Sequence, residues 1–115
     1  MSPTQKSQAE QILQSTGITV WVDEENQLDA VTAISGSGPA YFFLFIEALQ
    51  NAAIELGLDE TTAAQLAKQT ALGAATMAID NDVVTLRQQV TSKGGTTEQA
   101  IASFQQQGLS EMVLI

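Results

Sequence analysis

At 115 residues the chain is long enough for one domain with a hydrophobic core and too short for two. Hydrophobic residues make up 44% of the sequence, which is typical of a globular protein and excludes a disordered one. Thirteen acidic residues against four basic ones give a formal net charge of −9. This charge excludes nucleic acid and anionic membrane surfaces as expected partners, because both attract basic patches.

The sequence contains neither cysteine nor histidine. Disulfides, thiolate nucleophiles and catalytic triads with a histidine base are therefore excluded, and we expect no metal site. The polar beginning of the chain lacks the apolar segment of a signal peptide. The longest uncharged run, residues 30–46, is interrupted by glycines and a proline. We therefore expect a cytoplasmic protein without a membrane span.

The first part of the chain combines a short helix with a lone strand. Residues 5–15 carry apolar side chains at helical spacing, and Gly17 ends that pattern. Residues 18–22, ITVWV, have the β-branched and aromatic content of a strand. A single strand leaves its backbone edges unpaired and needs a partner strand from elsewhere. We therefore interpret this segment as part of something larger.

The middle of the chain predicts two helices separated by a kink. Residues 28–35 predict a first helix, and the GSGP at 36–39 predicts a kink or a restart. Residues 40–57 predict a longer helix that ends at Gly57. It contains YFFLFI, residues 41–46, which is apolar on every side of a helix. Such a helix must be buried all round, and a homo-oligomer is the simplest way to bury it.

The second half of the chain predicts helices only. Asp59 is the expected N-cap of a helix that carries a face of five alanines and Gly73. Shorter helices are expected over residues 83–90 and 96–107. A last helix begins at residue 109, and we expect it to be truncated, because the sequence ends on the apolar MVLI. The predicted fold class is all-α, with one short strand near the N-terminus.

The GSG at residues 36–38 invites comparison with a dinucleotide-binding glycine motif. No predicted strand directly precedes it, Pro39 follows it, and Tyr41 stands where the third glycine belongs. We therefore interpret this segment as a helix kink with close packing.

The segment SKGGTTEQ, residues 92–99, has two open interpretations. Thr96 has the spacing of an N-cap with Gln99 as the capping-box partner, which directs the backbone N–H groups of Gly95, Thr96 and Thr97 outwards. Free N–H groups and the helix dipole favour a carboxylate or phosphate there. Gly94 and Gly95 have no side chain to obstruct it, and the Thr97 hydroxyl is spare. On the residues alone, the segment is either an anion site or an ordinary capped turn.

Three segments, residues 29–49, 66–77 and 86–101, resemble pyrroline-5-carboxylate reductase in their order and in the motifs SGSGPAY and SKGGTT. The resemblance covers essentially the whole chain, but the family's N-terminal Rossmann domain is missing. It implies that residues 1–26 are the linker helix and last strand of the nucleotide-binding domain. Residues 27–115 are then the helical dimerisation and substrate domain, a bundle similar to the C-terminal domain of 6-phosphogluconate dehydrogenase.

Members of this family reduce 1-pyrroline-5-carboxylate to L-proline with NADPH or NADH, the last step of proline biosynthesis. The resemblance implies that the cofactor is bound mainly by the missing N-terminal domain and that the isolated chain is inactive. It also implies a homodimer, often assembled into a ring of dimers. A protonated imine needs only a hydride and a fixed geometry, which suits a chain without histidine or cysteine.

The resemblance also implies roles for single residues. The loop residues Gly94, Gly95, Thr96 and Thr97 are expected to bind the carboxylate of the cyclic imino acid. The Thr97 hydroxyl lies near the imine nitrogen and is the expected catalytic group, and Ser92 lines the same pocket. An acidic residue of the preceding loop approaches the substrate in relatives. That loop is shorter here, and Asp82 is its nearest equivalent.

Two alternatives remain from the sequence. The chain is a non-enzymatic helical oligomerisation module whose GGTT is only a capped turn, or it is the helical domain of a related imine or β-hydroxyacid dehydrogenase.

Overall fold

The computed structural model describes residues 2–6, 8, 21–22 and 24–114. Within this part of the chain all regular structure is helical, which confirms the predicted all-α class. Of the predicted strand, residues 18–20 lie outside the described residues, and Trp21 and Val22 are not in a strand. Of the predicted helix over 5–15, residues 5, 6 and 8 are helical, and the others lie outside the described residues.

The chain divides into two compact units, Met1–Phe45 and Ile46–Ile115. Helix α3 (Gly38–Glu55) crosses from the first unit into the second. The predicted domain boundary between residues 26 and 27 stays a prediction.

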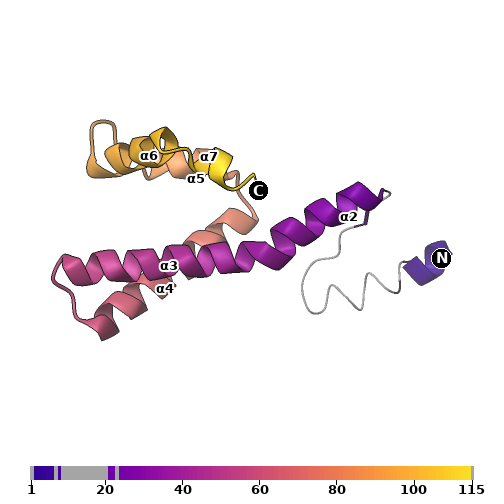
Figure 1. Cartoon of the computed structure of the whole chain (residues 1–115), viewed down its shortest axis with the longest axis horizontal. Helices are drawn as coiled ribbons and strands as arrows, with labels where there is room; N and C mark the ends of the chain where they lie inside the picture. The colour runs from indigo at the N-terminus through magenta and orange to yellow at the C-terminus, as the bar shows by residue number, and fades with distance from the viewer. Residues whose placement is uncertain (1, 7, 9–20, 23, 115) are drawn as a thin grey trace. The chain divides into compact units, whose positions relative to one another are not determined.

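In the first unit a π-helical segment joins two α-helices. Helix α2 (Glu25–Thr32) continues without a break into the π-helix Ala33–Ser37, from which α3 begins (Figure 1). Pro39 has no N–H for the carbonyl four residues back, so the helical hydrogen-bond pattern must change before it. The predicted kink is therefore a widened turn inside a continuous helix.

Helix α3 ends at the glycine that the sequence predicts. Gly57 has φ of +108°, a conformation that favours glycine. The N–H of Leu58 donates to the carbonyl of Ala53 at 3.1 Å, and the N–H of Gly57 donates to that of Ile54 at 3.0 Å. These two bonds form a Schellman motif, which satisfies the last carbonyls of the helix.

Helix α4 (Glu60–Ile79) follows α3 in the second unit and passes obliquely behind it in the view of Figure 1. Asp59 caps it as predicted, and its carboxylate accepts the N–H of Thr62 at 2.7 Å. Because the carboxylate accepts this bond, the pKa of Asp59 lies below its ordinary value. Ala63 and Ala67 are buried, and together with Leu49 and Ala53 of α3 they line a hollow between the two helices.

Three shorter helices complete the second unit. They are α5 (Val83–Gln89), α6 (Thr96–Gln106) and α7 (Leu109–Met112). Gly108, with φ of +86°, separates α6 from α7, in agreement with the predicted end of that helix. Helix α7 is four residues long, shorter than the helix that the sequence predicts from residue 109 onwards.

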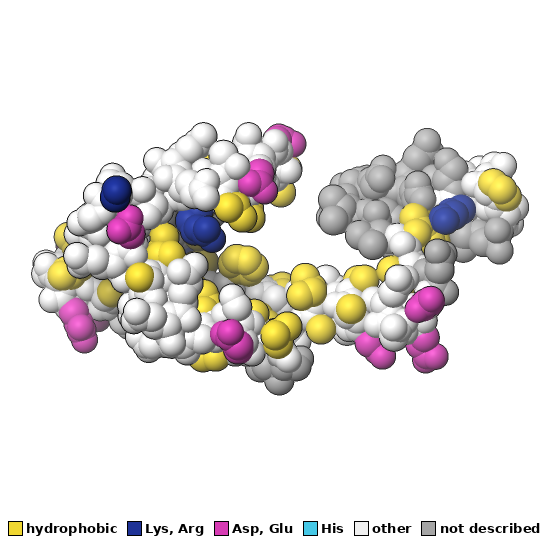
Figure 2. All heavy atoms as spheres, turned by 90° about the horizontal axis from the view of Figure 1, so that it is seen from above, with side chains coloured by type: hydrophobic (Ala, Val, Ile, Leu, Met, Phe, Trp, Pro, Cys, Tyr) yellow, Lys and Arg dark blue, Asp and Glu magenta, His cyan; other side chains and the backbone are white. Residues whose placement is uncertain are grey.

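Most large apolar side chains of the described residues are not buried by their own chain. Ala63 and Ala67 are the only buried apolar residues in that part. On α3, Phe42 is 72% exposed and Phe43 is 69% exposed. Figure 2 shows apolar side chains exposed at many points of the visible face. The prediction that residues 41–46 are buried all round is therefore not met within one chain.

None of the helices in the described part of the chain is long and apolar enough to cross a membrane. The same residues contain no group of three or more carboxylates that lie close enough together to hold a metal ion.

Candidate functional site

The turn between α5 and α6 contains most of the residues that the sequence predicts for a site. The N–H of Gly95 donates to the carbonyl of Ser92 at 3.0 Å, which closes a tight turn. Gly94 has φ of +76°, a conformation that other residues rarely adopt, so this position requires glycine. The turn therefore requires glycine at position 94, where nothing lies within 4 Å of an added Cβ.

Gly95 lies directly against Ser92. A Cβ atom at position 95 would be 3.2 Å from the Ser92 carbonyl oxygen, which is closer than ordinary contact, and 3.4 Å from the Ser92 Cβ. Any larger residue at position 95 must therefore displace Ser92 or open the turn. The structure thus places two of the predicted site residues in contact.

The predicted capping box is wrong. The N-cap of α6 is Gly95, with extended φ and ψ of −85° and 175°, and no side chain caps the helix. The Gly95 carbonyl accepts the first helical hydrogen bond, from the N–H of Gln99 at 3.3 Å. Thr96 is already helical, because the turn closed by Gly95 brings the chain into the helix one residue earlier than predicted. Glu98, and not Gln99, then occupies the third helical position.

The prediction that the Gly95 N–H is directed outwards is also wrong, because this N–H donates to the Ser92 carbonyl inside the turn. The free N–H groups are therefore shifted by one residue along the chain. The N–H groups of Thr96, Thr97 and Glu98 have no acceptor among the residues that the structure describes. The hydroxyls of Thr96 and Thr97 also make no hydrogen bond within that part of the chain, and both residues are exposed. Helix α6 has 11 residues, so its dipole adds positive potential at these donors. The arrangement is suited to an anion with two or three acceptor oxygens.

Asp82 lies apart from this turn, at the other end of α5. It is the N-cap of α5, and one carboxylate oxygen accepts the Thr85 hydroxyl at 2.8 Å and the Thr85 N–H at 3.0 Å. These bonds, the hydroxyl first, hold the pKa of Asp82 below its ordinary value. The seven residues of α5 span roughly 10 Å. The structure therefore gives Asp82 a capping contact and does not bring it to the turn.

The sequence reasoning missed an apolar groove between α4 and α5. It has a volume of about 300 Å³ and is lined on one side by Met77 and Ala78 and on the other by Val83, Leu86 and Val90. The spacing of the three α5 residues, three and four positions apart, was the available signal, because it places them on one helix face.

The fold and the turn together define a class of protein. It is a small helical domain whose described apolar side chains are mostly exposed and whose α6 N-terminus has unpaired N–H groups suited to an anion. Within this class, the chain belongs to the family described as pyrroline-5-carboxylate reductase dimerisation, whose model matches residues 25–114. The resemblance inferred from the motifs is thereby confirmed.

Relatives agree with this assignment. The chain is 53% identical over 115 residues to pyrroline-5-carboxylate reductase of Pseudomonas aeruginosa, in a match that covers 98% of this chain and 42% of the relative. The solved structure of a pyrroline-5-carboxylate reductase from Coxiella burnetii is 50% identical, with a TM-score of 0.93, and the match covers 99% of this chain and 43% of that one.

A more distant structure, pyrroline carboxylate reductase of Plasmodium falciparum with NADP bound, is 34% identical. Its TM-score is 0.83, and the match covers 99% of this chain and 47% of that one. This chain therefore spans less than half the length of the relatives that it matches.

Proposed function

We propose that this chain is the helical dimerisation and substrate domain of a cytoplasmic pyrroline-5-carboxylate reductase. Such an enzyme reduces 1-pyrroline-5-carboxylate to L-proline with NADPH or NADH, at the end of proline biosynthesis. The observation that carries this proposal is the set of unpaired N–H groups at the start of α6, in a chain of this family.

The substrate carboxylate is assigned to this helix start. Its two oxygens accept N–H bonds from Thr96, Thr97 and Glu98, and Gly94 and Gly95 leave the approach free of side chains. Ser92 lies at the edge of the same site through its contact with Gly95. These bonds fix the ring by its carboxylate, so the imine carbon is held in one orientation for reduction.

Thr97 is the proposed catalytic residue. Its hydroxyl has no intramolecular partner among the described residues and is exposed at the helix start, so it is available to the imine nitrogen. Asp82 stays a weaker assignment, because its carboxylate is engaged by Thr85.

The nicotinamide cofactor supplies the hydride, and we assign its binding mainly to a nucleotide-binding domain outside these 115 residues. The described residues do not fit a dinucleotide site, since Gly36 and Gly38 lie within a continuous helix and not at a strand-to-helix turn. The isolated chain is therefore expected to have no reductase activity.

The exposed apolar surface of α3 is proposed as the interface of a homodimer, which can assemble further into a ring of dimers. Burying a phenylalanine side chain contributes about 1.5–3 kcal/mol, so Phe42 and Phe43 alone provide a strong driving force. A non-enzymatic oligomerisation module would share this surface, and only the α6 helix start distinguishes the two functions.

The test is a titration of the chain, followed by the backbone amide signals in NMR. L-Proline, a stable analogue with the same carboxylate, is expected to shift the amides of Thr96, Thr97 and Glu98. Pyrrolidine, which lacks the carboxylate, leaves them unchanged. Gly95→Ala weakens L-proline binding by about tenfold, because the new Cβ displaces Ser92 and distorts the turn.

Thr97→Val is the second variant, and it retains the backbone donors while removing the hydroxyl. Carboxylate binding to this variant is expected to be nearly unchanged, whereas turnover in a two-domain enzyme that carries it falls. If L-proline and pyrrolidine give the same shifts, or if neither binds, the oligomerisation module is the better description.

A further inference from the structure

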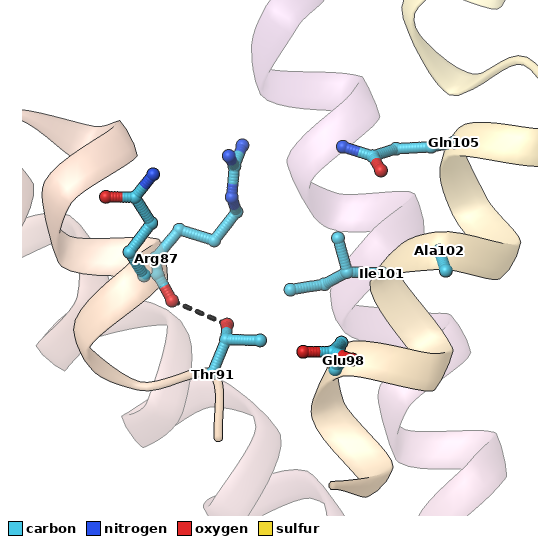
Figure 3. A pocket seen from close by; sticks show the side chains of 7 residues that line it. Arg87, Thr91, Glu98, Ile101, Ala102 and Gln105 are labelled. Atoms are coloured by element: carbon cyan, nitrogen blue, oxygen red, sulfur yellow. Dashed lines mark hydrogen bonds between the residues drawn. The ribbon is translucent and has the colours of Figure 1, made fainter. Parts of the chain in front are cut away.

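A second hollow lies between α5 and α6, and its lining extends to the turn that joins them (Figure 3). Its volume is about 300 Å³, at the lower end of the range for small-molecule sites. Arg87, Gln88 and Thr91 line it from the α5 side, and Glu98 and Gln105 are among the residues of α6 that line it. None of the six residues predicted for the substrate site takes part.

The hollow contains two opposite charges that do not neutralise each other. Arg87 and Glu98 come from opposite walls, and neither side chain forms an ion pair or hydrogen bond within the described part of the chain. In Figure 3 the Arg87 guanidinium lies toward the same end as the Gln105 amide. The Glu98 carboxylate lies toward the other end, beside Thr91, whose hydroxyl donates to the Arg87 carbonyl.

The space between the two ends is apolar. Ile101 projects from α6 toward α5 in this part of the hollow (Figure 3). Ala102 is also among the lining residues. A complementary occupant therefore has an anionic end, an aliphatic middle and a cationic end. Its length is limited by the small volume of the hollow.

We propose that this hollow binds a short aliphatic zwitterion, an amino acid whose carboxylate and ammonium groups are separated by a few methylenes. The carboxylate pairs with the Arg87 guanidinium and accepts from the Gln105 amide. The ammonium group donates to the Glu98 carboxylate, and the methylenes pack on Ile101. This site uses the Glu98 side chain, whereas the substrate carboxylate is assigned to the Glu98 N–H, so the two sites adjoin at the start of α6. The proposal rests on the side chains that line the hollow and not on the proposed function.

A second copy of the chain is a poorer occupant than a small zwitterion. The centres of protein interfaces are depleted of charged residues, whereas both walls of this hollow carry one. The surfaces that suit a second copy are the apolar ones, on α3 and in the groove between α4 and α5. With 13 acidic and 4 basic residues, another copy also offers few cations to Glu98.

The experiment is an NMR titration of the chain with 4-aminobutyrate as the probe. We expect saturable shifts at Thr91, Ala102 and the Gln105 side-chain amide, with a dissociation constant in the millimolar range because the hollow is open. Butyrate and butylammonium each present only one of the two charges. Each is expected to bind at least about tenfold more weakly, since one charge-assisted interaction is lost.

Variants identify the two charged groups. Arg87→Gln and Glu98→Gln are each expected to weaken 4-aminobutyrate binding by about tenfold. The matched controls Lys68→Gln and Glu55→Gln change the same charges outside the hollow and leave binding unchanged. The double variant Arg87→Glu with Glu98→Arg restores binding, because the zwitterion binds in the reverse direction.

Three results would overturn the proposal. Equal binding of butyrate and 4-aminobutyrate would show a simple anion site, and the absence of saturable shifts at the three reporters would show no site. A change of sedimenting mass in Arg87→Gln, with no 4-aminobutyrate binding in the parent chain, would show that a second copy covers the hollow. Gly95→Ala retains 4-aminobutyrate binding in the hollow, so a failure of the proposed substrate site is measured separately.

Discussion

The apolar surface of α3 and the polar turn before α6 are incomplete in different ways. On α3, Phe42 and Phe43 are well exposed, and hydrophobic burial, which is non-directional, is what they lack. At the turn, the missing partners are acceptors for specific backbone N–H groups of Thr96, Thr97 and Glu98. The first region is suited to another protein surface and the second to a small anion. The chain thus has one region suited to association with a protein and another suited to binding an anion. Single substitutions can affect one region without the other.

The largest expected effect is on association. Phe42→Glu is expected to weaken dimerisation at least about a hundredfold, because a two-fold interface loses two buried phenylalanines worth about 1.5–3 kcal/mol each. Sedimentation equilibrium measures the change. Phe42→Leu is the matched control and retains the dimer, since it keeps an apolar side chain. If the parent chain is monomeric, or if Phe42→Glu leaves the sedimenting mass unchanged, α3 does not form the dimer interface.

A smaller effect comes from two glycines that the chain uses differently. Gly57 has φ of +108°, so Gly57→Ala is expected to destabilise the chain by about 1–2 kcal/mol. Gly73 lies in the interior of α4 with nothing within 4 Å of an added Cβ, so Gly73→Ala stabilises the helix by about 0.5–1 kcal/mol. Urea unfolding measures both variants.

Gly73→Ala also tests the surface of α4. If it weakens dimerisation in place of stabilising the fold, the close approach that Gly73 permits belongs to a second chain. This outcome would show that the apolar interface includes the small-residue face of α4 as well as α3. The difference between this apolar interface and the polar turn before α6 would then be larger.

The smallest expected effect is on pH dependence. Asp59 and Asp82 both have a lowered pKa, so the stability that they contribute is present above the pKa of an unfolded aspartate. It is lost as the pH falls through the lower pKa of the folded chain. Thr85→Ala removes the hydroxyl that donates to Asp82 and raises the pKa of Asp82, while that of Asp59 stays unchanged. An NMR titration of the aspartate side chains checks this, and an equal shift of both residues would contradict it.

The sequence predicted the ends of helices best where a single residue decides them. Asp59, Gly57 and Gly108 have the predicted roles, because a side-chain acceptor or a positive φ acts within a few residues. The capping-box prediction placed the N-cap of α6 at Thr96, one position after the observed N-cap Gly95. Whether Thr96 or Gly95 caps α6 depends on how the preceding turn closes on Ser92, which the capping pattern alone does not contain.

Sequence motifs also led to the family and to the turn with the double glycine. They did not reveal the hollow between α5 and α6, because Arg87 and Glu98 are 11 positions apart and line the same hollow only once the two helices are placed together. The roles of Ser92, Thr97 and Asp82 toward a substrate stay predictions. Of these, Asp82 is the one whose hydrogen bonds in the structure favour a simpler capping role.

The sequence by itself determined the helical class, the positions of the glycine turns and the excess of apolar side chains, since these follow from local conformation and composition. Only the tertiary structure decided which of those side chains stay exposed and which N–H groups stay unpaired. It also decided which charges line the hollow between α5 and α6. Those properties depend on which groups each side chain contacts in space. Among the described residues only Ala63 and Ala67 are buried, so most of the apolar side chains there are left to contact another molecule.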